Sequence, residues 1–151
     1  ATNAAEKARA AARASGLLAL GDDSGLEVAA LGGAPGPRSA RFGGEGLDDA
    51  ERCQRLLAAL DGVPEARRGA RFVCVAALAT PSGELVTARG ECAGWILGAP
   101  RGAGGFGYDP IFALAPGGPP LAELPAAEKQ RQSHRGHAVR ALAPALRLRL
   151  R

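Results

Sequence analysis

Two neighbouring aspartates, Asp22 and Asp23, begin the sequence DDSG and are the first candidates for chemistry in this chain. The apolar run at residues 17–20 predicts a buried strand, and the acidic residues and glycines after it predict a loop where the strand ends. Adjacent carboxylates disfavour each other's ionisation unless a cation or hydrogen-bond donors face them. Mg²⁺ would serve, because it accepts one or two carboxylates together with water and phosphate oxygens. The alternative is an Asx turn that only shapes the loop.

A second candidate is the cationic segment EKQRQSHRGHA, where Lys129, Ser133, His134 and Arg135 fall within one or two helical turns. Lysine suits phosphate as a point charge and arginine as a fork, and a neutral imidazole can donate a hydrogen bond to a base oxygen. The alternative is a solvated helix face. Zinc is poorly supported, because His134 and His137 have no matching Cys or His elsewhere.

Lys7 is a third candidate, four residues after Asn3 on one face of a predicted helix. This helix leads directly to the segment with the two aspartates. An ordinary surface lysine is the alternative.

The glycine-rich segment RGAGGFGYDP, residues 101–110, contains the pattern G-x-G-x-x-G. That pattern indicates a dinucleotide fold only when a helix follows it, and here Tyr108, Asp109 and Pro110 lead into a short apolar strand instead. We therefore exclude a dinucleotide fingerprint. Phe106 and Tyr108 still predict either a site for a flat ligand or a hairpin loop with two anchoring aromatic rings.

The elements around these candidates predict one mixed α/β domain. Alanine-rich helical periodicity predicts the first helix, a capping aspartate predicts the second, and two β-branched, apolar runs separated by PSG predict a hairpin. The predicted segments are helices at 3–14, 48–60 and 135–150, the last interrupted by Pro144, a turn and helix start at 120–134, hairpin strands at 70–80 and 83–97, a strand at 111–114, and a surface loop at 31–46.

Composition narrows the class of protein. The chain has 151 residues, 46% of them hydrophobic and 23% charged, which is typical of a globular domain. No apolar run approaches 18 residues, no secretory signal is visible, and the three cysteines form no C-x-x-C pair, so we expect a reduced, cytoplasmic protein without membrane contact. The net charge of +4 comes largely from a basic tail, which is weak support for nucleic-acid binding.

Several of these motifs, taken in order, resemble the inosine triphosphate pyrophosphatase family, also called XTP/dITP diphosphatases. The resemblance rests on N-x-x-x-K-A, DDSGLEV, LGGAPG, SAR, ARFVCV, GGFGYDPIF, EK and SHRG, and it spans nearly the whole chain. It implies hydrolysis of dITP, ITP and XTP to the monophosphate and pyrophosphate with Mg²⁺. It also implies a homodimer, with a mixed, twisted sheet flanked by helices in two lobes that enclose a central cleft.

The resemblance assigns roles to individual residues. Asp23 would activate water and help to hold Mg²⁺, with Asp22 supporting it as a second metal ligand. Substrate contacts would come from Ser24, from Lys7 and Lys129 at the triphosphate, from Phe106, Gly107, Tyr108 and Asp109 around the base and sugar, and from His134 and Arg135 at the six-keto edge of the purine.

The family pattern also includes a strand and phosphate loop ahead of the first helix, which do not precede Ala1. We therefore expect residues 1–151 to form a single domain of this kind without that segment. The alternative function is a nucleotide-binding module without catalysis.

Overall fold

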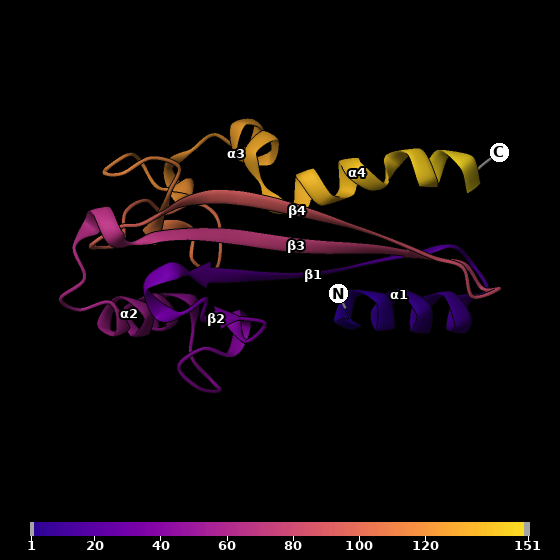
Figure 1. Ribbon diagram of the computed structural model, residues 1–151, viewed down its shortest axis with the longest axis horizontal. Coiled ribbons are helices and arrows are strands. Elements are labelled where there is room, and N and C mark those ends of the chain that lie inside the picture. Colours follow the sequence, from indigo (N-terminus) through magenta and orange to yellow (C-terminus); the bar gives the residue numbers. More distant parts are fainter. Residues whose placement is uncertain (1, 150–151) are drawn as a thin grey trace. The chain divides into compact units, whose positions relative to one another are not determined.

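The computed structural model describes residues 2–149 (Figure 1). It contains four α-helices and a five-stranded sheet in the order β2-β1-β3-β4-β5 among these residues. The chain forms two compact units. The first unit takes the residues up to 24, 73–91 and those from 131, and the second takes residues 25–72 and 92–130. Strands β1 (Ala19–Val28), β3 (Gly69–Ala79) and β4 (Leu85–Ile96) contribute residues to both.

The first unit has helices on both faces of its strands (Figure 1). Helix α1 (Thr2–Ser15) is rich in alanine, the residue with the highest helix propensity, and it buries a stripe at i, i+4 and i+8. Helix α4 (His134–Arg149) covers the opposite face. The α1 cluster contains Ala4, Ala8, Ala12, Ala77 and Ala79, and the α4 cluster contains Cys74, Ala76, Leu78, Ala138 and Leu142. Alternate residues of β3 thus serve the two helices.

The second unit has its own apolar core, built around helix α2 (Asp49–Ala59) and the remaining halves of the long strands. Asp48 caps α2, and its side chain and that of Glu51 form a capping box. The rings of Phe72 and Phe112 pack with their centroids 4.4 Å apart. The short strands β2 (Pro35–Gly36) and β5 (Phe112–Ala113) lie in this unit. Helix α3 (Ala126–Gln132) begins in it, and its last two residues belong to the first unit.

Most predicted elements are confirmed, and the mixed α/β class with them. The helices at 3–14 and 48–60, the hairpin and the short strand at 111–114 are all present. The PSG hairpin turn is closed by the Thr80 amide donating to the Glu84 carbonyl over 3.0 Å. The expected interruption at Pro144 is wrong, because α4 continues through it to Arg149. Proline removes one backbone donor there, and the Ala138 and Leu142 contacts hold the helix on the sheet.

The expectation for the DDSG segment is also wrong. The segment lies within β1 and is not a loop. The apolar run before it is not buried either, since Leu17 and Leu20 are 67% and 54% exposed. Aspartate and glycine disfavour strands in isolation, but β1 runs between β2 and β3 in the sheet, and tertiary pairing overrides that preference.

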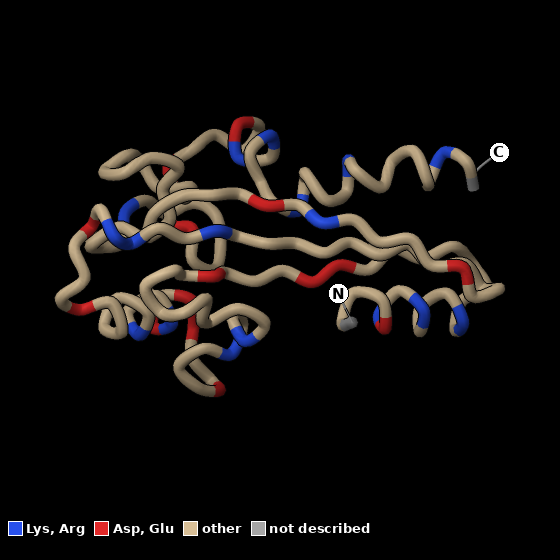
Figure 2. Tube along the Cα trace, viewed as in Figure 1, with Lys and Arg blue, Asp and Glu red and all other residues tan. Residues whose placement is uncertain are grey.

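The expected surface loop at 31–46 contains β2 and a 3-10 turn at Ser39–Arg41 in which Ser39 is buried. Figure 2 shows Lys and Arg interspersed with Asp and Glu along the chain. No helix among residues 2–149 is long and apolar enough to span a membrane.

Candidate functional site

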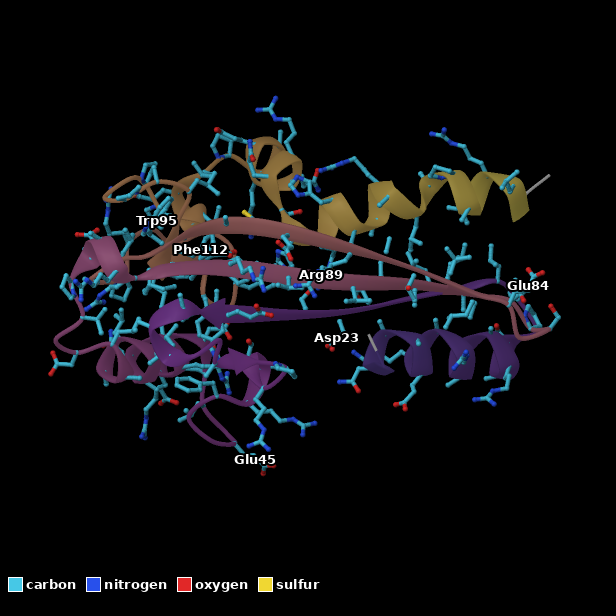
Figure 3. The ribbon with its side chains drawn as sticks, in the orientation of Figure 1. Asp23, Glu45, Glu84, Arg89, Trp95 and Phe112 are labelled. Carbon is cyan, nitrogen blue, oxygen red and sulfur yellow. The ribbon has the colours of Figure 1, made fainter. Side chains whose placement is uncertain are left out.

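Asp22 and Asp23 point to opposite faces of β1, because successive side chains of a strand alternate. The Asp22 Oδ2 atom accepts a hydrogen bond from Arg135 Nε at 2.5 Å and lies 3.9 Å from the thiol sulfur of Cys74, on the α4 face. Asp23 lies on the α1 face, as Figure 3 shows, and its Oδ2 is 3.5 Å from the amide nitrogen of Asn3. The two carboxylates therefore have different neighbours, and in this arrangement they do not converge on one point.

Lys7 lies beside this strand, as its position ahead of β1 suggested. Its ammonium group donates to the backbone carbonyl of Asp22 over 3.3 Å, from an exposed position on α1. The structure thus places Lys7, Asn3, Asp23 and Arg135 around a short stretch of β1 within the first unit.

Ser24 shares the α4 face of β1 with Asp22. Its hydroxyl is buried and has no hydrogen-bond partner within residues 2–149. Nearby Cys74 is buried too, and burial raises the pKa of its thiol. A buried hydroxyl without a partner costs free energy, so Ser24 is a candidate for a contact with a ligand.

The cationic segment 129–135 divides between α3 and the start of α4. The Ser133 hydroxyl accepts from the Gly136 amide at 2.9 Å and so caps α4, which begins at His134. Helix α4 approaches β4 closely at Gly90, where an added Cβ would lie 2.1 Å from the His134 carbonyl oxygen. This close packing of α4 on Gly90 sets the distance between strand β4 and the first residues of α4, His134 and Arg135.

His137 has a structural role. Its Nδ1 lies 2.9 Å from the Glu91 carbonyl oxygen and its Nε2 lies 3.1 Å from the Arg131 carbonyl oxygen. Within the described part of the chain, no three His, Cys, Asp or Glu side chains form a group that could hold a metal ion.

The segment at 101–110 is irregular and leads into a 3-10 turn, Asp109–Ile111, as the rejection of a dinucleotide fingerprint required. Phe106 is 65% exposed, and the Lys129 ammonium lies 4.7 Å from the centre of its ring. Lys129 also forms an ion pair with the buried carboxylate of Asp109, which accepts a 3.0 Å hydrogen bond from the Phe106 amide. Phe106, Asp109 and Lys129 therefore form one cluster within the second unit.

Gly105 and Tyr108 shape this segment. Gly105 has a φ of 72°, and an added Cβ would lie 2.3 Å from the Asp109 carboxylate. Tyr108 is only 6% exposed, and its hydroxyl donates to the Ser39 carbonyl over 2.6 Å. Burial raises the pKa of Tyr108. Its side chain thus supports the loop from inside the unit, whereas the sequence expectation made it part of the ligand pocket.

A pocket of about 310 Å³ lies between this loop and α2. Its lining comes from the first turns of α2 and from the glycines around Phe106: Asp49, Ala50, Cys53, Gln54, Pro100, Gly102, Ala103, Gly104, Gly105, Phe106, Gly107 and Pro110. Asp49 and Cys53 were not among the sequence candidates. Their only signal was the i, i+4 spacing on one helix face, and the loop that they contact lies more than 50 residues away.

The residues present fit a magnesium ion held mainly by Asp23. Its one hydrogen bond among the described residues is the long one to Asn3, whereas Asp22 is already paired with Arg135. Mg²⁺ needs few protein carboxylates when water and phosphate oxygens complete its coordination. The donor chemistry of Asp23 is compatible with such an ion.

Comparison with known proteins gives a consistent result. Residues 1–145 match the Ham1 family. The chain is 56% identical over 137 residues to the dITP/XTP pyrophosphatase of Syntrophobacter fumaroxidans, covering 91% of this chain and 58% of that protein. It is 57% identical over 142 residues to the dITP/XTP pyrophosphatase of Gloeobacter violaceus, covering 94% and 70%. The chain thus spans little more than half the length of the first of these relatives.

Solved structures agree on the fold. A HAM1 protein from Coxiella burnetii superposes with a TM-score of 0.86 at 46% identity, covering 95% of this chain and 74% of that one. The Staphylococcus aureus Ham1 protein gives a TM-score of 0.86 at 40% identity, covering 96% and 74%.

Proposed function

Because the chain belongs to the Ham1 family, we propose that it hydrolyses the non-standard purine nucleotides dITP, ITP and XTP to the monophosphate and pyrophosphate. The observation that carries this proposal is the identity of more than half of the aligned residues to relatives named dITP/XTP pyrophosphatase. These relatives lend no support to a nucleotide-binding module without catalysis.

Asp23 is the proposed general base. Its carboxylate is partly exposed on β1, and the Asn3 amide steadies it without neutralising its charge. It would accept a proton from the water that attacks the α-phosphorus, as the new P–O bond forms and the bond to the pyrophosphate oxygen breaks. Lys7, held over β1 by the Asp22 carbonyl, would stabilise negative charge on the leaving pyrophosphate.

Mg²⁺ is the proposed cofactor, with Asp23 as its protein ligand, and when bound it would supply charge neutralisation at the phosphate oxygens. Asp22 supports this group less directly than the sequence suggested, because its carboxylate holds the Arg135 guanidinium. Its proposed contribution is to orient that arginine.

Arg135 and His134 at the start of α4 are the proposed readers of the purine six-position. Both side chains can donate hydrogen bonds to the O6 atom of hypoxanthine or xanthine. Adenine presents an amino group there, so the same donors would be left without an acceptor, at a cost of about 1–3 kcal/mol each. Ser24, whose buried hydroxyl has no partner among residues 2–149, is a further proposed substrate contact.

In the second unit, Phe106 is the proposed stacking surface for the purine. Its ring is exposed, and its backbone amide is held by a hydrogen bond to the Asp109 carboxylate. Base–aromatic stacking contributes about 1–3 kcal/mol per base. Gly107 and Asp109 would shape this place, and Lys129 would add positive charge near the phosphates.

We further propose that the protein acts as a homodimer in the cytoplasm, without nucleic acid or membrane as partner. The resemblance supports the dimer. The three cysteines, all buried and none in a disulfide, support a reducing compartment.

The proposal is tested by product analysis. Protein that contains residues 1–151 is incubated with Mg²⁺ and dITP, XTP or dATP, and the nucleotide and phosphate products are separated. We expect dIMP and pyrophosphate in equal amounts from dITP, the corresponding products from XTP, and little from dATP. Release of inorganic phosphate with a diphosphate, or equal turnover of dATP, would contradict the proposal.

A further inference from the structure

Both main-chain polar groups of Gly107 are held by one face of helix α2. The Gly107 amide donates to the Asp49 carboxylate over 2.9 Å, and the Cys53 thiol donates to the Gly107 carbonyl over 3.4 Å. Asp49 and Cys53 are four residues apart, so their side chains lie on the same side of the helix. Cys53 is 1% exposed, which places this contact inside the second unit.

The residues on either side of Gly107 are also held by hydrogen bonds. The Phe106 amide is bonded to Asp109, and the Tyr108 hydroxyl is bonded to the Ser39 carbonyl. The backbone of Phe106 and Gly107 and the side chain of Tyr108 are therefore anchored, while the Phe106 ring remains 65% exposed. An exposed aromatic ring on an immobilised backbone is preorganised, because binding need not order it first.

We propose that Asp49, assisted by Cys53, is a positioning residue that presents Phe106 to the purine base. This inference rests on the proposed function. A charge-assisted hydrogen bond is stronger than a neutral one, so the bond to Asp49 is the main anchor and the thiol is the weaker one. Loss of the Asp49 anchor would let the Phe106 loop sample other conformations and would weaken substrate binding.

The effect should fall on KM more than on kcat. Asp49 and Phe106 belong to the second unit, whereas the proposed base Asp23 lies on β1 in the first unit. For Asp49→Ala we expect KM for dITP to rise about tenfold with kcat within about twofold of wild type. Asp49→Asn should raise KM by less than Asp49→Ala does, because its side-chain oxygen can still accept from the Gly107 amide although the charge is lost.

Asp48→Ala is the matched control. Asp48 accepts from the Glu51 amide at 2.7 Å and caps the same helix, but it does not contact Gly107. We expect this variant to lower stability and leave KM unchanged. Hydrogen exchange of the Gly107 amide, measured where all variants are fully folded, should accelerate about tenfold in Asp49→Ala, by less in Asp49→Asn, and remain unchanged in Asp48→Ala.

The inference is overturned if Asp49→Ala leaves the Gly107 exchange rate unchanged, or if Asp48→Ala raises KM as much as Asp49→Ala does. Wild-type protein that hydrolyses no dITP would contradict the proposed function instead. In that case the exchange rates still decide whether Asp49 anchors the loop.

Discussion

Replacing Tyr108 with phenylalanine tests whether the aromatic loop is anchored as described. The Tyr108 hydroxyl donates to the Ser39 carbonyl over 2.6 Å, and both residues are 6% exposed. The substitution removes one oxygen and keeps the ring. It leaves the Ser39 carbonyl without that donor, in a place where water does not readily replace it.

The expected loss follows from these contacts. A buried polar group that loses its partner costs about 1–3 kcal/mol, and the smaller side chain changes packing little. We therefore expect Tyr108→Phe to lower the free energy of unfolding by about 2 kcal/mol. For a chain of this length that corresponds to a fall in Tm of about 4–8 °C.

Urea unfolding measures this loss directly, with an unchanged m-value indicating that the denatured state is not altered. The control is Phe106→Leu, a change at the exposed neighbouring residue, which should alter stability by less than about 0.5 kcal/mol. A Tyr108→Phe variant as stable as wild type would show that the hydroxyl is not buried against Ser39, and the anchoring of the loop would be refuted.

Three other predictions follow from the same geometry. Asp23→Asn should abolish dITP turnover without changing the circular dichroism spectrum, because it removes the base and preserves shape; substantial residual activity would exclude that role. Gly90→Ala should destabilise the protein by more than about 3 kcal/mol in urea unfolding, because its Cβ would lie 2.1 Å from the His134 carbonyl oxygen, and a neutral effect would contradict the close packing of α4. Burial raises the pKa of Cys53 from 9.0 to about 11, so between these values the unfolded chain loses this proton while the folded chain keeps it. Stability contributed by the thiol is complete below pH 9 and should fall as pH rises to 11, by up to about 3 kcal/mol. Cys53→Ala should show a smaller fall in unfolding experiments at pH 8 and 10.5, and an equal fall would place its cause elsewhere.

Local signals were sufficient for helices α1 and α2. The alanine stripe of α1 and the Asp48 and Glu51 capping box of α2 are short-range features, so the sequence predicts both elements. Strand β1 could not be predicted in the same way. Aspartate and glycine favour turns, and β1 is extended here as the sheet neighbour of β3, which is distant in the chain.

The functional site likewise contains some residues that the sequence predicts and some contacts that depend on the fold. Lys7, Asp23 and Arg135 could be selected from residue type and spacing, and the structure brings them to neighbouring places on β1. The alternation of Asp22 and Asp23 between two faces depends on the strand, so their different partners could not be foreseen. Asp49 and Ser39 support the aromatic loop only through long-range hydrogen bonds, which leave no local pattern in the sequence.

The central claim is selective hydrolysis of six-keto purine nucleotides, and a competition assay tests it most directly. Equal concentrations of dITP and dATP are offered together with Mg²⁺, and the two monophosphates are quantified at early times. We predict a ratio of dIMP to dAMP of at least about tenfold, because adenine leaves the purine-reading donors without an acceptor. Equal amounts of the two products, or the absence of both, would contradict the account.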